Sequence, residues 1–513
     1  MEYYAKRTGI TFAGNCRSYP LGVPAGSRLV LNASRYCIVL HPMKRKKRIV
    51  LENILVSDYA AGGKSLSRTE EGKVIFIEGA VPGDEVDVLL MKNKADWAEA
   101  RVIRTHKLSP MRTEPFCAHF GVCGGCKWQM LPYPQQLEYK QREVAENLKR
   151  IGKITLPEIR PILASATDRY YRNKLEFTFC NRRYLLADEM AEGVSAEADV
   201  LGFHVPGFFD KVIDVNTCYL MPEPVNAIRN EVRRFAQEHG YSFYDIRNHT
   251  GWLRNMVVRM NNEGELMVNL VLGHDSEDKK DILNHIQQQF PQITTLLYTI
   301  NPKMNDSIND LEPQIWYGKG YIMIKLGDFS YKTGPKSFFQ TNTLQAEKMY
   351  EVVREFADTG KKGIVYDLYC GTGSIGIFCS KNAEKIIGVE LIEAAVEDAR
   401  ENARLNQLEN THFFAGDVAD ICTPAFFEQH GRPDVVITDP PRAGMHPKLV
   451  TQILAMEAPV VVYVSCNSAT QARDLHILDE KYEVVATQPL DMFPHTHHIE
   501  NVVKLVLRQP AGS

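Results

Sequence analysis

The chain has 513 residues, which is too long for one ordinary domain and indicates three or four. Its residues are 44% hydrophobic and 24% charged, a composition typical of globular proteins and not of fibrous or disordered ones. No apolar run approaches the roughly 18 residues of a membrane helix, and the first residues lack the pattern of a secretion signal, which excludes the membrane-spanning and secreted classes. The net charge of −3 predicts no global attraction to nucleic acid, so any such binding must come from local patches.

The N-terminal part begins without regular structure. Residues 1–42 show no helical or alternating period, and we expect a disordered or mis-annotated leader with the true start at Met43. From Arg48 to about His106, short β-rich runs alternate with turn residues, which is typical of a small β-barrel. Lys92 and Lys94 in this part are candidates for phosphate contacts, although such charges are more often solvated surface.

A cysteine cluster follows the predicted barrel. Cys117, Cys123 and Cys126 form a C-x5-C-x2-C pattern, and Cys218 is the best candidate for a fourth ligand. Four thiolates hold either zinc or an iron–sulfur cluster, and the spacing leaves both open. The total of 11 cysteines is odd and no export signal precedes them, so reduced thiols in a cytoplasmic protein are expected rather than disulfides.

The middle of the chain is mixed. An amphipathic helix is predicted at about 133–150, and residues 160–330 are rich in predicted strands. Residues 169–174 interleave aromatic and basic side chains, a composition that suits RNA, although a strand core explains the aromatics equally well. After Phe338 strands alternate with helices, which indicates a parallel sheet.

A glycine turn opens this last part. Residues 364–376 form a buried strand that ends in Asp367, followed by glycines and the start of a helix, which is a weak nucleotide-binding pattern by itself. The next strand, Lys385–Glu390, ends in an acid at the position where doubly wound folds hold a ribose, and a third strand, Thr411–Asp417, also ends in an acid. Together with the Asp-Pro-Pro sequence downstream, this predicts a nucleoside ligand of the S-adenosylmethionine type.

The reactive groups are expected at the ends of the next two strands. Asp439 and two prolines end the fourth strand, and the following Arg442 replaces the aromatic residue that amino-group methylases carry there. The fifth strand, Val460–Val464, leads to Cys466, a candidate thiolate nucleophile; a lone cysteine is more often a buried structural one, but this one shares the edge of the cofactor site. Glu500 precedes the last strand and is a candidate general base, or else a solvated strand-end carboxylate.

These segments together resemble the RNA uracil-5-methyltransferase family of the RumA/TrmA type. The resemblance extends from about Met43 nearly to the end of the chain, and the motifs follow one another in the family's order. The segments that carry it are Phe338-Phe339-Gln340-Thr341-Asn342, Asp367-Leu368-Tyr369-Cys370-Gly371-Thr372-Gly373, Gly388-Val389-Glu390, Asp439-Pro440-Pro441-Arg442, Ser465-Cys466-Asn467 and His498-Ile499-Glu500-Asn501.

The resemblance implies a role for each of these positions. Cys466 is implied to be the nucleophile and Glu500 the proton acceptor, and the implied cofactor contacts are Gln340, Tyr369, Glu390 and Asp439. The segment 79–86 resembles a TRAM domain, and the family's ribosomal-RNA branch carries a [4Fe–4S] cluster on the positions of the four cysteines. Because the target carbon lies within a stacked base, the uridine has to be flipped out of the RNA.

We therefore expect a C-terminal Rossmann-like methyltransferase domain, an N-terminal OB-like TRAM barrel and a central α+β iron–sulfur domain. The expected boundaries are 1–42 for the leader, 43–106 for the barrel, 107–330 for the central domain and 331–513 for the methyltransferase domain. The expected reaction is methylation of uracil C5 in 23S ribosomal RNA by a monomeric, cytoplasmic enzyme. The alternatives are methylation of transfer RNA and a non-catalytic RNA-binding protein with a degenerate cofactor fold.

Overall fold

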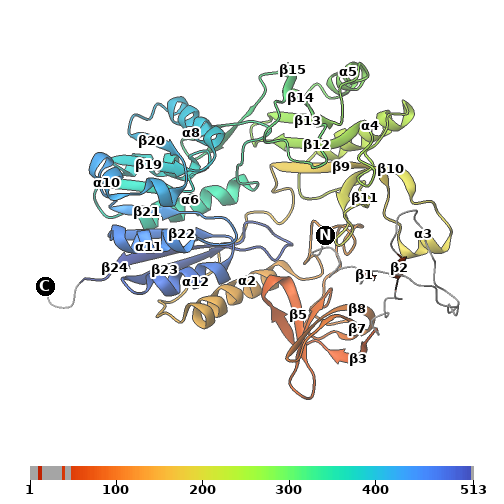
Figure 1. Cartoon of the computed structure of the whole chain (residues 1–513), viewed down its shortest axis with the longest axis horizontal. Coiled ribbons are helices and arrows are strands. Elements are labelled where there is room, and N and C mark those ends of the chain that lie inside the picture. The colour runs from red at the N-terminus through yellow and green to blue at the C-terminus, as the bar shows by residue number, and fades with distance from the viewer. Residues whose placement is uncertain (1–9, 14–36, 41–47, 510–513) are drawn as a thin grey trace.

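The computed structural model describes residues 10–13, 37–40 and 48–509 (Figure 1). Within the predicted leader it describes two strands, β1 (Ile10–Ala13) and β2 (Cys37–Leu40), which pair antiparallel. The rest of that leader, including Met43, lies outside the described residues, so its nature stays a prediction. Among the described residues no helix is long and apolar enough to cross a membrane.

An N-terminal sheet of six strands follows, in the order β3-β7-β8-β6-β5-β4. Every second side chain along the strands points inward, and these side chains form a small hydrophobic core that includes Ile75, Ile77, Val86 and Val88. All its pairings are antiparallel except the one between β6 and β8. The strands are β3 (Val50–Leu55), β4 (Asp58–Ala60), β5 (Lys64–Arg68), β6 (Val74–Glu78), β7 (Glu85–Asn93) and β8 (Trp97–Lys107), with a short helix η1 (Ala61–Gly63).

The helix predicted at about 133–150 is present as α2 (Tyr133–Asn147), extended by one wider turn, η2 (Leu148–Gly152). Val144 and Leu148 are fully buried against the core of the C-terminal domain. Figure 1 shows α2 lying between the N-terminal sheet and the C-terminal domain. An element that precedes the central domain in sequence therefore packs on the last domain.

The central part is built on a seven-stranded sheet in the order β11-β10-β9-β12-β13-β14-β15, antiparallel except between β13 and β14. Its core is large because β12 and β13 are buried along almost their whole length. The strands are β9 (Lys174–Arg182), β10 (Glu197–His204), β11 (Val212–Asp214), β12 (Leu253–Met260), β13 (Leu266–Leu272), β14 (Thr295–Ile300) and β15 (Gln314–Gly318). The helices are α3 (Ala187–Ala191), α4 (Val225–Glu238) and α5 (Lys279–Gln289), and a hairpin of β16 (Ile322–Leu326) and β17 (Phe329–Thr333) follows.

The C-terminal sheet has the order β20-β19-β18-β21-β22-β24-β23. Strands β18 to β22 are parallel, and β24 runs antiparallel to β22 and β23. The strand order reverses between β18 and β21, which is where doubly wound sheets bind ligands. The strands are β18 (Ile364–Leu368), β19 (Lys385–Glu390), β20 (Thr411–Ala415), β21 (Val435–Thr438), β22 (Val460–Ser465), β23 (Tyr482–Leu490) and β24 (Glu500–Leu507).

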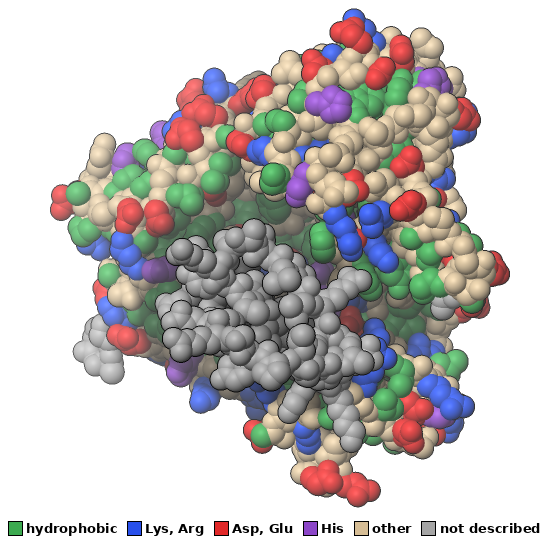
Figure 2. Space-filling view, turned by 45° about the vertical axis from the view of Figure 1, so that its right-hand side comes forward, with side chains coloured by type: hydrophobic (Ala, Val, Ile, Leu, Met, Phe, Trp, Pro, Cys, Tyr) green, Lys and Arg blue, Asp and Glu red, His purple; other side chains and the backbone are tan. Residues whose placement is uncertain are grey.

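Helices cover both faces of this sheet, so the predicted Rossmann-like domain is confirmed (Figure 1). They are α6 (Thr343–Ala357), α7 (Ser374–Cys379), η3 (Ser380–Asn382), α8 (Glu393–Leu405), α9 (Val418–Ile421), α10 (Pro424–His430), α11 (Pro447–Met456) and α12 (Ser468–Leu478). Figure 2 shows acidic and basic side chains intermingled on the visible face, in keeping with the small net charge. The four predicted domain boundaries stay predictions.

Candidate active site

The glycine turn after β18 brings two carboxylates to the carboxyl edge of the sheet. The Asp367 carboxylate accepts a hydrogen bond from the backbone N–H of Gly376 at 2.8 Å, and a Cβ atom on Gly376 would stand 2.9 Å from the Asp367 Oδ2. Glu390 accepts from the backbone N–H groups of Gly371 (3.2 Å) and Ile392 (2.9 Å). Asp367 therefore fixes the first turn of α7 and Glu390 fixes the glycine turn, at the edge where doubly wound folds bind a nucleoside.

The third strand-end acid has a different role. The predicted strand Thr411–Asp417 ends at Ala415, and Asp417 caps helix α9 by accepting from the Ala419 N–H at 2.8 Å. Two of the three strand-end acids, Asp367 and Glu390, thus hold the glycine turn. Tyr369 lies between them with a left-handed backbone (φ 62°), which is uncommon for an aromatic residue.

The segment that contains Gln340 lies just before helix α6 in the chain and contacts the same domain. Asn342 caps α6 by accepting from the Gln345 N–H at 3.2 Å, and its amide donates to the Met492 carbonyl at 3.0 Å. The backbone carbonyl of Gln340 accepts from the Asn173 amide of the central domain at 2.9 Å. The segment is therefore fixed on two domains at once.

Two neighbouring strands deliver the candidate reactive groups. Asp439 follows β21, and Cys466 follows β22, where Asn467 caps α12 by accepting from the Ala469 N–H at 3.1 Å. Glu500 opens β24, and the next residue, Asn501, pairs with Ser465 of β22. Sheet register therefore places Cys466 and Glu500 side by side, 34 positions apart in the chain.

The electrostatics of these groups show that they form one cluster. Burial, and then the Glu500 carboxyl, raise the pKa of the Cys466 thiol to about 11, while a hydrogen bond and the positive charge of Arg442 oppose that rise. Burial raises the pKa of Asp439 to about 7. Burial and the neighbouring Asp439 raise the pKa of Glu500 well above its ordinary value, again opposed by Arg442. The site thus holds a thiol whose thiolate only Arg442 favours, a carboxyl whose raised pKa makes its ionised form more basic, and one cation.

Arg442 is a site residue that the sequence pattern did not assign. Its backbone carbonyl accepts from the Asn467 amide at 3.1 Å, and its Nη2 donates to His498 Nδ1 at 3.2 Å. Burial, and then His497, lower the pKa of His498 to about 3, so His498 is a neutral acceptor. The Asp-Pro-Pro-Arg sequence pointed to the cation but did not show what it contacts.

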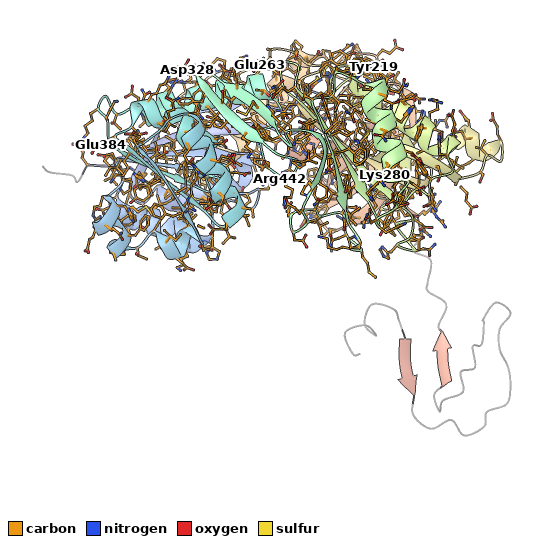
Figure 3. All side chains as sticks on the ribbon, turned by 90° about the horizontal axis from the view of Figure 1, so that it is seen from above. Tyr219, Glu263, Lys280, Asp328, Glu384 and Arg442 are labelled. Atoms are coloured by element: carbon orange, nitrogen blue, oxygen red, sulfur yellow. The ribbon has the colours of Figure 1, made fainter. Side chains whose placement is uncertain are left out.

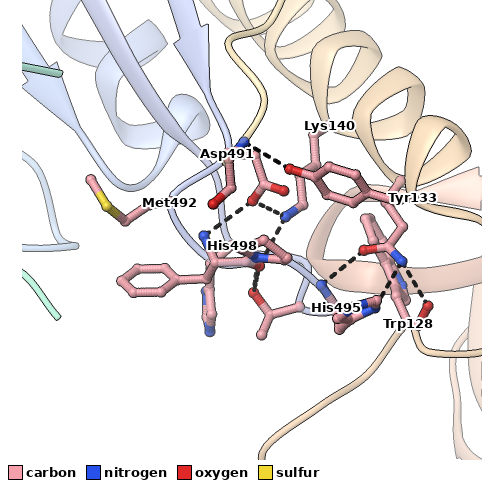
Figure 4. Close-up of polar contacts among 12 residues, drawn as sticks. Trp128, Tyr133, Lys140, Asp491, Met492, His495 and His498 are labelled. Atoms are coloured by element: carbon pink, nitrogen blue, oxygen red, sulfur yellow. Dashed lines mark hydrogen bonds and ion pairs between the residues drawn. The ribbon is translucent and has the colours of Figure 1, made fainter. Parts of the chain in front are cut away.

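The loop between β23 and β24, residues 491–499, contacts several other parts of the chain (Figure 4). The His495 carbonyl accepts from the Lys127 and Trp128 N–H groups at 2.8 and 3.0 Å, and the Gln136 side-chain oxygen accepts from the His495 N–H at 2.8 Å. Lys140 donates to Asp491 at 2.6 Å, and both side chains are fully buried. The cysteine-bearing loop and α2 thus hold the segment that leads to Glu500.

The Lys140–Asp491 ion pair gives a stability prediction. We expect Lys140→Met to lower the free energy of unfolding by about 3–5 kcal/mol, because it leaves a buried carboxylate without its partner. Lys140→Met/Asp491→Leu is expected to recover most of that loss, since both charges are then gone. Calorimetry should show Lys481→Met, which breaks the surface pair with Glu457, to be nearly neutral. A cost of Lys140→Met no larger than that of Lys481→Met would contradict the prediction.

The four candidate metal-ligating cysteines come together. Cys117, Cys123, Cys126 and Cys218 line one cavity of about 120 Å³, together with aromatic side chains such as Phe116. Within residues 48–509, however, no group of three or more Cys, His, Asp or Glu side chains has the arrangement that would hold a metal ion. Four thiols around one largely apolar cavity match the donor set of an iron–sulfur cluster, which is larger than a single ion.

Comparison with known proteins identifies the family of the chain. The tRNA (Uracil-5-)-methyltransferase family model matches residues 313–508, and the TRAM domain model matches residues 51–103. RNA methyltransferases described as uncharacterized, from Bacteroides thetaiotaomicron and Porphyromonas gingivalis, are 52% and 47% identical to the chain; the matches cover 88% of it in both cases, and 100% and 99% of the relatives.

A solved structure is similar over nearly the whole chain. It is the Pyrococcus abyssi tRNA (uracil-54, C5)-methyltransferase in complex with S-adenosyl-L-homocysteine, which is 28% identical, has a TM-score of 0.67 and is matched over 90% of this chain and 100% of that one. The protein is thus an S-adenosylmethionine-dependent RNA methyltransferase with a TRAM domain. It belongs to the RNA uracil-5-methyltransferase family of the RumA/TrmA type.

Proposed function

We propose that the protein methylates C5 of a uracil in 23S ribosomal RNA, with Cys466 as nucleophile and Glu500 as proton acceptor. The observation that carries this proposal is the cluster of Cys466, Glu500, Asp439 and Arg442 at the carboxyl edge of a cofactor-binding sheet. Uracil C5 becomes nucleophilic only after addition at C6, and a thiolate beside a base provides both halves of that reaction.

The steps balance with these residues. Cys466 gives its proton to solvent and, as a thiolate steadied by Arg442, forms a bond to C6, which moves an electron pair into the ring and makes C5 nucleophilic. S-adenosylmethionine, when bound, supplies the electrophilic methyl group and a positive charge. C5 takes that methyl group and the sulfur it leaves becomes neutral; Glu500, ionised beside Arg442, then takes the C5 proton. The C5–C6 double bond then re-forms as the bond to the Cys466 sulfur breaks.

The proposed cofactor contacts are Gln340, Tyr369, Glu390 and Asp439. Glu390 is bound to the glycine turn from the side where doubly wound folds hold a ribose. Tyr369 precedes that turn, Asp439 follows the neighbouring strand β21, and Gln340 lies in the segment held to both the central and the C-terminal domains.

Transfer RNA is the second candidate substrate. It is favoured by the similar Pyrococcus abyssi enzyme, which is a tRNA (uracil-54, C5)-methyltransferase and is matched over its full length. Because that match covers 90% of this chain, the overall architecture does not by itself separate the two substrates. The preference for ribosomal RNA rests on the resemblance of the TRAM segment and the four cysteines to the ribosomal branch.

The deciding experiment offers the enzyme large-subunit ribosomal RNA and transfer RNA, each isolated from cells that lack 5-methyluridine. Nucleoside-resolved mass spectrometry of mapped fragments then shows where the methyl group appears. Product at a defined site in ribosomal RNA supports the proposal, and product in transfer RNA alone moves the enzyme to the second candidate. No product in either makes a non-catalytic RNA-binding protein the better hypothesis.

We propose further that the four cysteines hold a [4Fe–4S] cluster with a structural role. Anaerobically purified protein is expected to contain about four irons and four sulfides per chain and to absorb in the visible range. Cys218→Ser should lose that absorption, whereas Cys180→Ser, which changes a buried cysteine outside the cavity, should keep it. About one zinc per chain and no sulfide would favour a zinc site instead.

Cofactor affinity is expected to depend on pH. Burial raises the pKa of Asp367 and of Asp439 to about 7, so both carboxyls ionise between about pH 6 and about pH 8. S-adenosylmethionine carries a sulfonium cation, and we expect its Kd to fall about tenfold over this range as the carboxylates become charged. Calorimetric titration should show a smaller change for S-adenosylhomocysteine, whose sulfur is neutral. An equal pH dependence for both ligands would contradict this explanation.

The location and oligomeric state also remain proposals. We propose a cytoplasmic enzyme, because the chain modifies RNA, and a monomeric one, because the active-site cluster is built within one chain. Light scattering of the purified protein at micromolar concentration should give the mass of one chain.

A further inference from the structure

We propose that a strip of aromatic and guanidinium side chains, running from Arg442 to Tyr170, binds the unpaired nucleotides that flank the target uridine. This inference rests on the proposed function, because it takes RNA as the substrate and the cluster around Cys466 as the point where the uridine enters. Its exposed or half-buried members are Arg442, His498, Phe493, Arg172, Phe116, Arg169, Tyr219 and Tyr170, and the buried His495 packs beneath Phe116 without reaching the surface.

The half of the strip nearest the reactive groups starts at Arg442, whose positive charge acts on the Cys466 thiol and whose Nη2 donates to His498 Nδ1 at 3.2 Å. The His498 ring lies 6.3 Å from the Phe493 ring, centroid to centroid. The Arg172 guanidinium lies over Phe493 at 5.2 Å. Two guanidinium groups therefore flank the His498 and Phe493 rings between the reactive cysteine and the central domain.

The far half of the strip lies on the central domain, where Phe116 and Tyr219 also line the cysteine-bearing cavity and Arg169 and Tyr170 lie outside it. The Phe116 ring meets His495 edge-on at 5.0 Å, and the Arg169 guanidinium lies over Phe116 at 3.9 Å. Tyr219 packs against Phe116 at 5.3 Å and against Tyr170 at 6.1 Å. Figure 3 shows Arg442 at the junction between the two large domains and Tyr219 on the central domain.

Tyr170 is the most informative residue of the strip. Its side chain is 47% exposed, whereas that of its neighbour Tyr171 is buried and donates to the Pro494 carbonyl at 3.0 Å. The Tyr170 backbone has a left-handed φ of 55°, fixed by a 2.7 Å hydrogen bond from its N–H to the Tyr219 carbonyl. An exposed aromatic side chain on a strained backbone contributes little to the stability of the fold. Its position is therefore better explained by a ligand that it binds.

Charge identifies that ligand as a polyanion with aromatic faces. The strip contains three guanidinium groups. Asp168 lies 4.0 Å from Arg169 and 3.3 Å from His495, and at the other end the carboxyls of Glu500 and Asp439 lie in the cluster with Arg442. Guanidinium groups bind phosphates and also stack on bases, and tyrosine faces stack on bases. Stacking requires unpaired bases, so the strip fits single-stranded RNA rather than a duplex.

The test measures binding and not methylation. A fluorescently labelled single-stranded RNA of about ten nucleotides is titrated with the full chain, without cofactor, and its anisotropy gives Kd. We expect Tyr170→Ala to weaken binding about tenfold, within the range for one stacked base, and Tyr170→Phe to bind as the wild type does. The matched control is Tyr317→Ala, because Tyr317 is 46% exposed but lies on β15, away from the strip.

Tyr170→Gly separates a role in binding from a role in folding. Glycine adopts a left-handed φ without strain, so this variant should melt no lower than the wild type and yet lose affinity as Tyr170→Ala does. A duplex of the same sequence should bind all variants equally. Unchanged affinity of Tyr170→Ala and Tyr170→Gly for the single strand overturns the proposal, even if the enzyme methylates RNA. If no RNA is methylated but Tyr170→Ala and Tyr170→Gly still lose affinity for the single strand, the RNA-binding strip is supported and the proposed reaction is contradicted.

Discussion

Cys466→Ala is expected to reduce methyl transfer by about 10⁴-fold, because without the thiolate nothing adds to C6 and uracil C5 stays unreactive. The affinity for S-adenosylmethionine should change little, since the proposed cofactor contacts lie on other segments of the domain. Single-turnover transfer of a labelled methyl group into RNA measures the first quantity, and calorimetric titration of the cofactor measures the second.

A matched variant controls for the loss of a cysteine as such. Cys422→Ala removes a buried cysteine of the same domain, whose pKa burial raises to about 12, and should leave the rate within a few-fold of the wild type if the fold holds. Retention of more than about one hundredth of the rate by Cys466→Ala would show that the reaction does not proceed through this thiol.

Much of the C-terminal domain could be predicted from sequence because its features are local. Strands β18, β19 and β22 are short apolar runs with Asp367, Glu390 and Ser465 at or next to their last positions, and β19 matches its predicted bounds, Lys385–Glu390. Asp417 was wrongly placed at a strand end, because Gly416 breaks the strand (φ 146°) and frees the Asp417 side chain to cap the next helix. In the sequence, an acidic residue after an apolar run looks the same whether it ends a strand or caps a helix.

The contacts that complete the site could not be predicted, because they join distant parts of the chain. Gln136 and His495 are 359 positions apart, and Lys140 and Asp491 are 351 apart. Neither pair leaves a periodic pattern, since a buried lysine on α2 looks like any solvated helix residue until its partner is known. In the same way, sequence alone could not separate exposed Tyr170 from buried Tyr171.

Glu500→Gln is expected to stop the reaction after the methyl group has been transferred. Without the carboxylate the C5 proton stays in place, so the bond from Cys466 to C6 cannot break and the enzyme remains joined to the RNA. Release of 5-methyluridine should fall by about 10³-fold, within the range for loss of a general base. A protein–RNA band that survives a denaturing gel, and that carries the labelled methyl group, is the expected observation.

The same substitution makes a second, independent prediction about the nucleophile. The Glu500 carboxyl helps to raise the pKa of Cys466, so replacing it with a neutral amide should lower that pKa and speed alkylation of Cys466 by iodoacetamide near pH 8. Glu457→Gln, which changes an exposed carboxylate, should alter neither measurement. A covalent band together with faster alkylation would assign proton removal to Glu500. Slow turnover with neither change would mean that Glu500 only supports the fold around Cys466, and that another group takes the C5 proton.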